Sequence, residues 1–183
     1  RAAAAFNTLF GISSLATVGI EEIGETIRTP KIFQLYYHKD KALTWGMIDR
    51  CRDAGFDALA LTVDTIVGGN RERDLWTGFT SPPRLTPSSL ASFATHPSWT
   101  LNYLLREPFE LSNLKDHIPE GSNVSISVSD YFSTMLDQTM DWDAAAEVRE
   151  RWGKAFCLKG IMSVEDARKS VEIGADAIMV SNH

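Results

Sequence analysis

Two similar stretches of the sequence each end in a residue that could take part in proton transfer. Residues 55–64, GFDALALTVD, and residues 174–183, GADAIMVSNH, share a glycine, an aspartate and an alanine ahead of an apolar run. The first stretch ends on Asp64 and the second on His183, each two positions after a hydroxyl residue. A histidine paired with a carboxylate is a common general base with the group that steadies it. The two stretches therefore present an acid and a histidine at equivalent positions.

Polar side chains that could support this chemistry follow the other apolar runs. They are Ser13, Ser14, Gln34, Tyr36, Thr62, Lys159 and Ser181, with Arg71 and Arg73 just beyond Asp64. Taken singly, each has a structural explanation, such as a cap or a solvated side chain. If an acid, a base, a lysine and an arginine come together at one end of the fold, they would instead form a site for oxidation or proton abstraction. No metal site is predicted.

The elements that must position these residues alternate along the chain. Short apolar runs at 9–16, 32–37, 58–64, 155–160 and 177–183 predict strands that are buried on both faces, as in a parallel sheet. Helical patterns with terminal signals lie at 20–27, 42–55, 141–153 and 163–174. Strand alternating with helix predicts an α/β fold. Strands that all end in polar residues favour a (β/α)8 TIM barrel, whose active site lies at the carboxyl ends of the strands.

A long insertion interrupts this rhythm from residue 65 to about residue 138, where no strand is predicted. It is far longer than an ordinary βα loop, and Thr86-Pro87 and His96-Pro97 look like helix starts. An insertion at this face predicts a lid, a partner surface or a membrane contact, and a loop without function is the alternative. Its apolar residues favour contact with a membrane or a partner, unless they pack back on the barrel. They are Leu90, Phe93, Trp99, Tyr103, Leu104 and Phe109.

Composition limits the remaining classes of function. The chain has 183 residues and a formal net charge of −6, which predicts one domain and argues against a nucleic-acid partner. No apolar run reaches the roughly 18 residues of a membrane span, and no signal-peptide pattern opens the sequence. Cys51 and Cys157 are predicted to be buried free thiols, which fits a reducing cytoplasm.

Several motifs together resemble one enzyme family. The motifs are SSLAT, IEEI, FQLYYHKD, LTVDT, GNRERD, LKGIMSVEDA and GADAIMVSNH, in this order along the chain. They resemble the FMN-dependent 2-hydroxy-acid oxidases and dehydrogenases. Within that family, the stretch GGNRERDLWTGFTSPPRLTPSSLASFATHPSW is most similar to the bacterial cytochrome- or quinone-linked L-lactate dehydrogenases.

The resemblance implies roles for the residues named above. Ser13, Gln34, Thr62, Lys159 and Ser181 match cofactor-binding positions for FMN. Tyr36 and Arg71 match substrate-binding positions, and a guanidinium suits a carboxylate because it can donate two parallel hydrogen bonds. His183 matches the catalytic base, and Asp64 matches the acid that stabilises its protonated form. A lysine beside the N1–C2 edge of the flavin would stabilise the charge of the reduced ring.

The resemblance also implies a function for a larger protein. Since a complete barrel needs about 250 residues, residues 1–183 are expected to be the central part of one FMN-binding (β/α)8 domain, and inactive alone. The expected reaction is oxidation of L-lactate to pyruvate, with electrons passed to a cytochrome or quinone. Alternatives are an (S)-2-hydroxy-acid oxidase, a mandelate dehydrogenase, an FMN isomerase, a nucleotide dehydrogenase or an inactive fragment. A cytoplasmic or peripheral inner-membrane location and a homotetramer are also implied.

Overall fold

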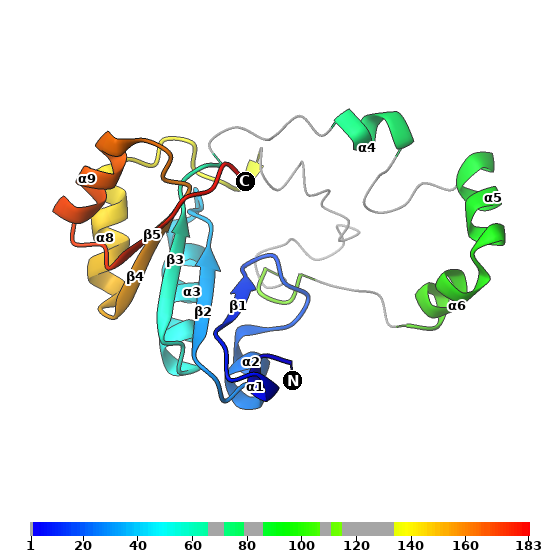
Figure 1. Ribbon diagram of the computed structural model, residues 1–183, viewed down its shortest axis with the longest axis horizontal. Coiled ribbons are helices and arrows are strands. Elements are labelled where there is room, and N and C mark those ends of the chain that lie inside the picture. Colours follow the sequence, from blue (N-terminus) through cyan, green and yellow to red (C-terminus); the bar gives the residue numbers. More distant parts are fainter. Residues whose placement is uncertain (1, 66–71, 79–85, 107–110, 115–133) are drawn as a thin grey trace.

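A five-stranded parallel sheet forms the centre of the chain. The computed structural model describes residues 2–65, 72–78, 86–106, 111–114 and 134–183 (Figure 1). The strand order is β1-β2-β3-β4-β5. The strands are β1 (Phe10–Ser13), β2 (Lys31–Leu35), β3 (Ala58–Thr62), β4 (Ala155–Lys159) and β5 (Ala177–Met179). All five predicted strands are present. Each strand is shorter than its predicted apolar run. The apolar runs extend into the turns, where residues such as Leu15 and Val63 still pack against the core.

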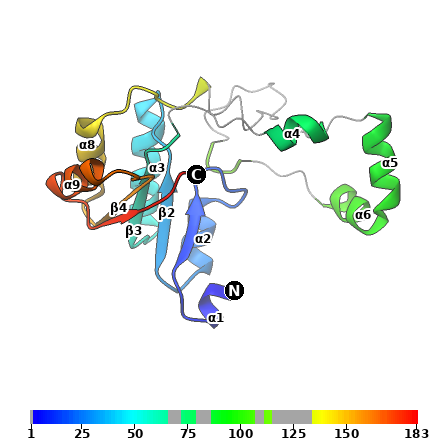
Figure 2. The same ribbon diagram turned by 45° about the horizontal axis from the view of Figure 1, so that its top comes forward.

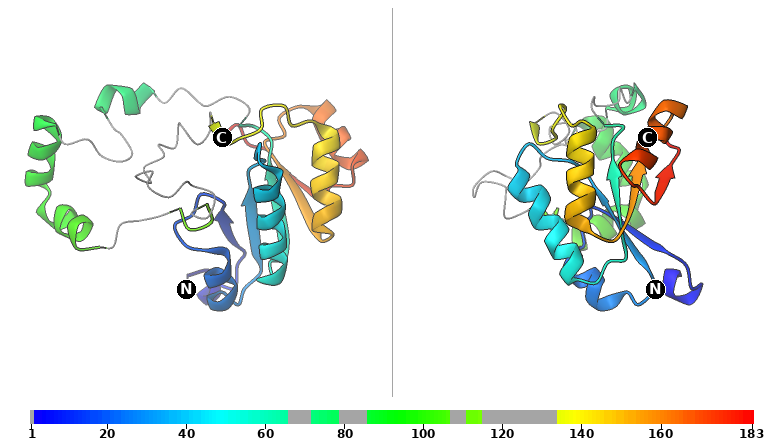
Figure 3. Two further views of the ribbon diagram at one scale, coloured as in Figure 1. Left: turned by 180° about the vertical axis from the view of Figure 1, so that it is seen from behind. Right: turned by 90° about the vertical axis from the view of Figure 1, so that its left-hand side faces the viewer.

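Each pair of neighbouring strands is joined through a helix. These helices are α2 (Ile20–Thr26), α3 (Lys41–Asp53), α8 (Trp142–Trp152) and α9 (Val164–Glu172). Helix α3 contacts both α2 and α8, and it runs alongside α8 in Figure 3. In a doubly wound sheet the strand order reverses at a switch point, whereas here it is sequential throughout. Because parallel connections are right-handed, sequential order keeps the helices on one face. This is the arrangement of consecutive units of a (β/α)8 barrel, and the predicted α/β fold is confirmed.

The two faces of the sheet carry side chains of different size. The helix-facing residues are large and fully buried, and they include Phe33, Leu35, Leu59, Leu61 and Leu158. They pack against α3 and α8 residues such as Met47 and Trp152. The opposite face has small residues along its lower rows, among them Gly11, Ala58, Ala60 and Cys157. Apart from Ile32, which lies between Gly11 and Ala58, the inner face therefore carries smaller side chains than the helix-facing side.

The similar stretches 55–64 and 174–183 also make the same contact just before β3 and β5. The carboxylate of Asp57 accepts a hydrogen bond from the backbone N–H of Lys31 at 2.7 Å. The carboxylate of Asp176 accepts one from the backbone N–H of Phe156 at 2.8 Å. In both cases the aspartate fixes the beginning of the neighbouring strand, so the two repeats are equivalent at this end too.

Both cysteines lie in the core, as predicted. Cys51 and Cys157 are buried free thiols, and burial raises the pKa of each. They are therefore thiols rather than thiolates near neutral pH, which makes them poor nucleophiles.

The insertion contains three helices in its described part, α4 (Glu72–Thr77), α5 (Pro87–Thr95) and α6 (Pro97–Leu105). Helices α5 and α6 begin at the two predicted prolines. The structure has no strand between residues 65 and 138 in the ranges it describes, apart from an isolated bridge at Leu136. Figures 1 and 2 show α4, α5 and α6 away from the sheet. Phe109 lies outside the described residues. No helix in those residues is long and apolar enough to span a membrane.

Two segments of the insertion are anchored to the sheet end of the molecule. Asn113 is buried, and its side-chain oxygen accepts a hydrogen bond from the N–H of Ile20 at the start of α2. Farther along, the backbone N–H of Lys39 donates to the carbonyl of Met135 at 2.9 Å. An ion pair between Lys41 and Asp137 lies beside this contact. The insertion therefore leaves the fold at Thr65 and rejoins it beside β2.

Candidate active site

The two residues at the ends of the repeats meet above the sheet. Nδ1 of His183 lies 3.0 Å from Oδ1 of Asp64. Asp64 follows β3, and its side chain is only 10% exposed. His183 follows β5 and lies where the chain passes over the carboxyl ends of the strands (Figure 2). Because a carboxylate can only accept, this contact favours the proton on Nδ1. The other ring nitrogen, Nε2, is then the basic atom.

Lys159 is the cation of this cluster. It is the last residue of β4 and is 20% exposed. Its Nζ lies 3.5 Å from Oδ2 of Asp64 and 3.2 Å from Nδ1 of His183. Oδ2 is buried and has no hydrogen-bond partner among the described residues. The ammonium therefore supplies a positive charge beside the buried carboxylate.

Tyr36 brings a hydroxyl to the other side of the imidazole. Its side chain comes just after β2 and is 4% exposed. The hydroxyl lies 3.4 Å from Nε2 of His183, and the two rings lie at an angle of 44° with centroids 6.3 Å apart. A small polar molecule near this hydroxyl would also lie near the basic nitrogen.

A row of polar groups continues along the inner face from this cluster. Ser13 and Gln34 are neighbours in the register of β1 and β2. The amide of Gln34 donates to the hydroxyl of Thr62 at 2.7 Å. Thr62 in turn pairs in register with Lys159. Amide, hydroxyl and ammonium groups thus line one face across four strands.

Other residues predicted for the site differ in position. The hydroxyl of Ser181 accepts a hydrogen bond from the backbone N–H of His183 at 3.1 Å, so it helps to fix the backbone of that residue. Ser14 follows Ser13 by one position, is fully buried, and its hydroxyl has no partner among the described residues. Arg71 lies outside the described residues, and Arg73 is an exposed residue of α4.

Sequence reasoning missed one residue that touches this cluster. Gly160 directly follows Lys159 and lies against the side chain of Asp64. Its presence in the LKG motif was visible, but nothing in a sequence indicates which distant side chain a glycine contacts.

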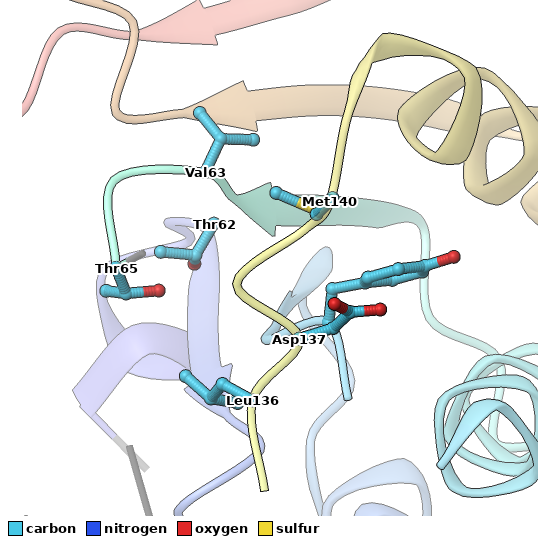
Figure 4. A pocket seen from close by; sticks show the side chains of 7 residues that line it. Thr62, Val63, Thr65, Leu136, Asp137 and Met140 are labelled. Carbon is cyan, nitrogen blue, oxygen red and sulfur yellow. The ribbon is translucent and has the colours of Figure 1, made fainter. Parts of the chain in front are cut away.

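A small pocket lies next to the cluster, where the insertion returns. Figure 4 shows Leu136, Asp137 and Met140 facing the end of β3. The lining residues are Tyr37, Thr62, Val63, Thr65, Leu136, Asp137 and Met140. Only Thr62 is shared with the polar row, so this pocket borders the site and does not contain the acid–base pair.

Comparisons with known proteins agree with this arrangement. The family model for FMN-dependent dehydrogenases matches residues 1–183. The chain is 36% identical to a putative L-lactate dehydrogenase of Mycobacterium tuberculosis (strain ATCC 25618 / H37Rv), covering 100% of the chain and 43% of that protein. It is 35% identical to an L-lactate dehydrogenase of Pseudomonas aeruginosa (strain LESB58), covering 100% of the chain and 48% of that protein. The chain thus spans about half the length of these curated relatives.

Solved structures give the same result. The crystal structure of the monotopic membrane protein (S)-mandelate dehydrogenase matches with a TM-score of 0.90 at 28% identity, covering 100% of this chain and 48% of that one. A mandelate oxidase matches with a TM-score of 0.73 at 29% identity, covering 100% and 43%. A sheet of this order, a polar inner face and a match over the whole sequence agree: this chain belongs to the FMN-dependent dehydrogenase family.

Proposed function

We propose that the protein containing this chain oxidises an L-2-hydroxy acid, specifically L-lactate to pyruvate, and passes the electrons to a quinone or cytochrome. The observation that carries the proposal is the contact between Asp64 and His183, with Tyr36 and Lys159 on either side. The names of the relatives support lactate. Residues 1–183 would be the central part of one FMN-binding barrel domain, with the insertion at about 65–138.

The proposed chemistry centres on Nε2 of His183. A 2-hydroxy acid loses two protons and two electrons when its carbinol carbon becomes a carbonyl. Nε2 accepts one of these protons, and Nδ1 donates to Asp64 throughout. The resulting imidazolium is stabilised by the adjacent carboxylate, and more strongly in a dry site than in water. Tyr36, whose hydroxyl lies 3.4 Å from Nε2, is proposed to hold the substrate there, and Arg71 is proposed to bind its carboxylate.

The inner face fits the flavin that the family requires. Ser13, Gln34, Thr62 and Lys159 offer donors and acceptors in one row, which suits the alternating carbonyls and ring nitrogens of a flavin edge. Ser181 is proposed as a further contact. Ala60 and Cys157, which follow Gln34 in register across β3 and β4, are small residues beside these groups. FMN, when bound, would take up the two electrons that the substrate loses, together with its second proton.

The insertion is proposed to meet the membrane or the electron acceptor. Between Pro87 and Leu105 there is no charged residue apart from the titratable His96. Phe93, Trp99 and Tyr103 form a continuous stack, with centroids 5.5 and 5.2 Å apart. Trp99 is 51% exposed and Leu104 is 69% exposed. An uncharged aromatic and apolar surface of this kind suits the membrane interface. A peripheral location at the inner face of the cell membrane and a tetrameric assembly belong to the same proposal.

Anaerobic reduction of the flavin tests the proposed reaction. The purified protein is mixed with L-lactate, and bleaching of the flavin absorbance is followed, with D-lactate as the stereochemical control. We expect bleaching with the L-isomer only. Flavin-loaded protein that no L-2-hydroxy acid bleaches would refute the proposed reaction. Reoxidation by a soluble quinone, by cytochrome c or by oxygen then identifies the class of acceptor.

Two alternatives have specific support. The TM-score of 0.90 to an (S)-mandelate dehydrogenase favours mandelate as substrate, and faster bleaching by (S)-mandelate than by L-lactate would select it. The second alternative is that residues 1–183, which span about half of these relatives, are inactive alone. Expressing residues 1–183 alone and recording the visible spectrum separates that alternative, because a fragment without stoichiometric flavin cannot carry out the reaction.

A further inference from the structure

Gly160 leaves no room for a side chain of its own. A Cβ atom on Gly160 would lie 2.5 Å from Cβ of Asp64, 2.6 Å from its Cγ and 2.9 Å from its Oδ2. These distances are well below van der Waals contact, and the atoms met belong to a side chain that is only 10% exposed. The backbone N–H of Gly160 donates to the carbonyl of Met179 at 3.0 Å, which ties the glycine to β5. Gly160 is therefore a fixed surface against which Asp64 rests.

The position of Asp64 decides which nitrogen of His183 carries the proton. Asp64 Oδ1 and Lys159 Nζ both lie within hydrogen-bond distance of Nδ1, at 3.0 and 3.2 Å. The carboxylate needs a proton on Nδ1, whereas an ammonium can donate only to an Nδ1 that has none. The first case leaves Nε2 basic, toward Tyr36. The second places the neutral ring's only proton on Nε2, where it blocks proton uptake.

We propose that Gly160 is a positioning residue that holds the Asp64 carboxylate against Nδ1 of His183, so that Nε2 is the base. The inference rests on the proposed function for its role in catalysis, but the arrangement it describes exists without substrate. A methyl group at residue 160 must push the Asp64 side chain by about 1 Å to reach ordinary contact. Oδ1 then leaves hydrogen-bond range of Nδ1, and Lys159 remains as the partner of that nitrogen.

A control variant at a second glycine distinguishes the proposed role of Gly160 from a purely structural one. Gly160 has a φ of +109°, a conformation that alanine adopts only with strain. Gly55 also has a positive φ, of +69°, but a Cβ there would meet nothing within 4 Å. Gly55→Ala therefore introduces backbone strain without contact to Asp64, at the opposite end of β3.

The test is the tautomer of His183, read from the ¹⁵N shifts of the imidazole in histidine-labelled protein with its flavin bound and no substrate added. The His183 signals are assigned by comparison with His183→Gln. In the parent protein and in Gly55→Ala, we expect the neutral ring to carry its proton on Nδ1. In Gly160→Ala the Nε2–H form should become the main neutral tautomer. The rate of flavin reduction by L-lactate should fall about 10²-fold, as expected for a misplacement of about 1 Å, with little change in KM.

A double variant guards against indirect effects. In an Asp64→Ala background the carboxylate is gone, so adding Gly160→Ala should change neither the tautomer ratio nor the reduction rate further. An Nδ1–H tautomer that persists in Gly160→Ala would overturn the proposal, as would an additive loss in the double variant. A normal tautomer response in a protein that no 2-hydroxy acid reduces would support the role of Gly160 and refute the proposed function instead.

Discussion

Nδ1 of His183 and Oδ1 of Asp64 lie 3.0 Å apart although 119 positions separate them in the chain. The two residues occupy corresponding places in two repeats, one after β3 and one after β5. Their contact places the carboxylate of Asp64 beside the imidazole of His183, which must become cationic during the proposed reaction.

Replacement of Asp64 by Asn should slow the chemical step. The amide keeps the shape of the carboxylate but removes the charge that stabilises the imidazolium. We expect flavin reduction at saturating L-lactate to fall roughly 10²-fold or more, with little change in substrate affinity. Stopped-flow absorbance under anaerobic conditions measures both. Asp57→Asn is the control, because Asp57 lies at the far end of β3, where its carboxylate accepts a hydrogen bond at the start of β2. Equal rates in Asp64→Asn and the parent would make Asp64 a structural residue.

Replacement of Lys159 by Gln should weaken flavin binding. The ammonium is the cation at the end of the polar row and is only 20% exposed, so a neutral amide cannot replace its charge. We expect the dissociation constant for FMN to rise at least tenfold, as measured by quenching of flavin fluorescence. Lys169→Gln removes an equal charge from α9, where Lys169 pairs with Glu165 at the surface. If the two variants bind FMN alike, Lys159 is not a flavin contact.

The ion pair between Lys41 and Asp137 should make stability depend on pH in the acid range. Hydrogen bonds from Lys41 and Thr139 lower the pKa of Asp137 from 3.8 to about 2. A lowered carboxyl pKa contributes stability that is fully present above pH 3.8 and is lost as the pH falls through about 2. The Tm difference between the parent and Asp137→Asn should therefore shrink between pH 5 and pH 2. A difference that is constant over this range would show that the pair contributes nothing through charge.

Removal of the apolar surface of α5 and α6 should release the protein from membranes. The variant replaces Trp99, Leu101 and Leu104 by Ser, since these side chains are 51%, 57% and 69% exposed. We expect loss of flotation with phosphatidylglycerol–phosphatidylcholine vesicles and unchanged flavin reduction by L-lactate. The control replaces three exposed serines of the same helices by Ala, at positions 88, 92 and 98. Continued flotation of the triple Ser variant would show that these residues do not hold the protein on the membrane.

The sequence allowed the strands and most of the polar cluster to be predicted, because both follow from local patterns. Residues two apart in a strand share a face, so Gln34 and Tyr36, or Thr62 and Asp64, could be assigned together before their contacts were known. The equivalent roles of Asp57 and Asp176 at the starts of neighbouring strands could also have been predicted, since the two aspartates occupy the same position in the two repeats.

Contacts between distant segments could not be predicted in this way. The first N–H of α2 is capped by Asn113, whose side chain lies 93 positions away, and no local signal marks such a cap. The contact between Gly160 and Asp64 is equally hidden, because a glycine in a sequence is compatible with any turn. The ion pair between Lys41 and Asp137, where the insertion returns beside β2, joins residues 96 positions apart that no sequence motif links.

The anchoring of the insertion at both ends has a consequence for its length. Val63, just before it, donates its backbone N–H to the carbonyl of Lys159, and the backbone N–H of Asp137, just after it, donates to the carbonyl of Tyr37. The segment between is a closed loop, and the entropy of closing a loop grows only with the logarithm of its length. Doubling that length costs about 0.6 kcal/mol, less than a single good hydrogen bond contributes. Residues can therefore be gained or lost in this segment at little thermodynamic cost to the sheet that holds both of its ends.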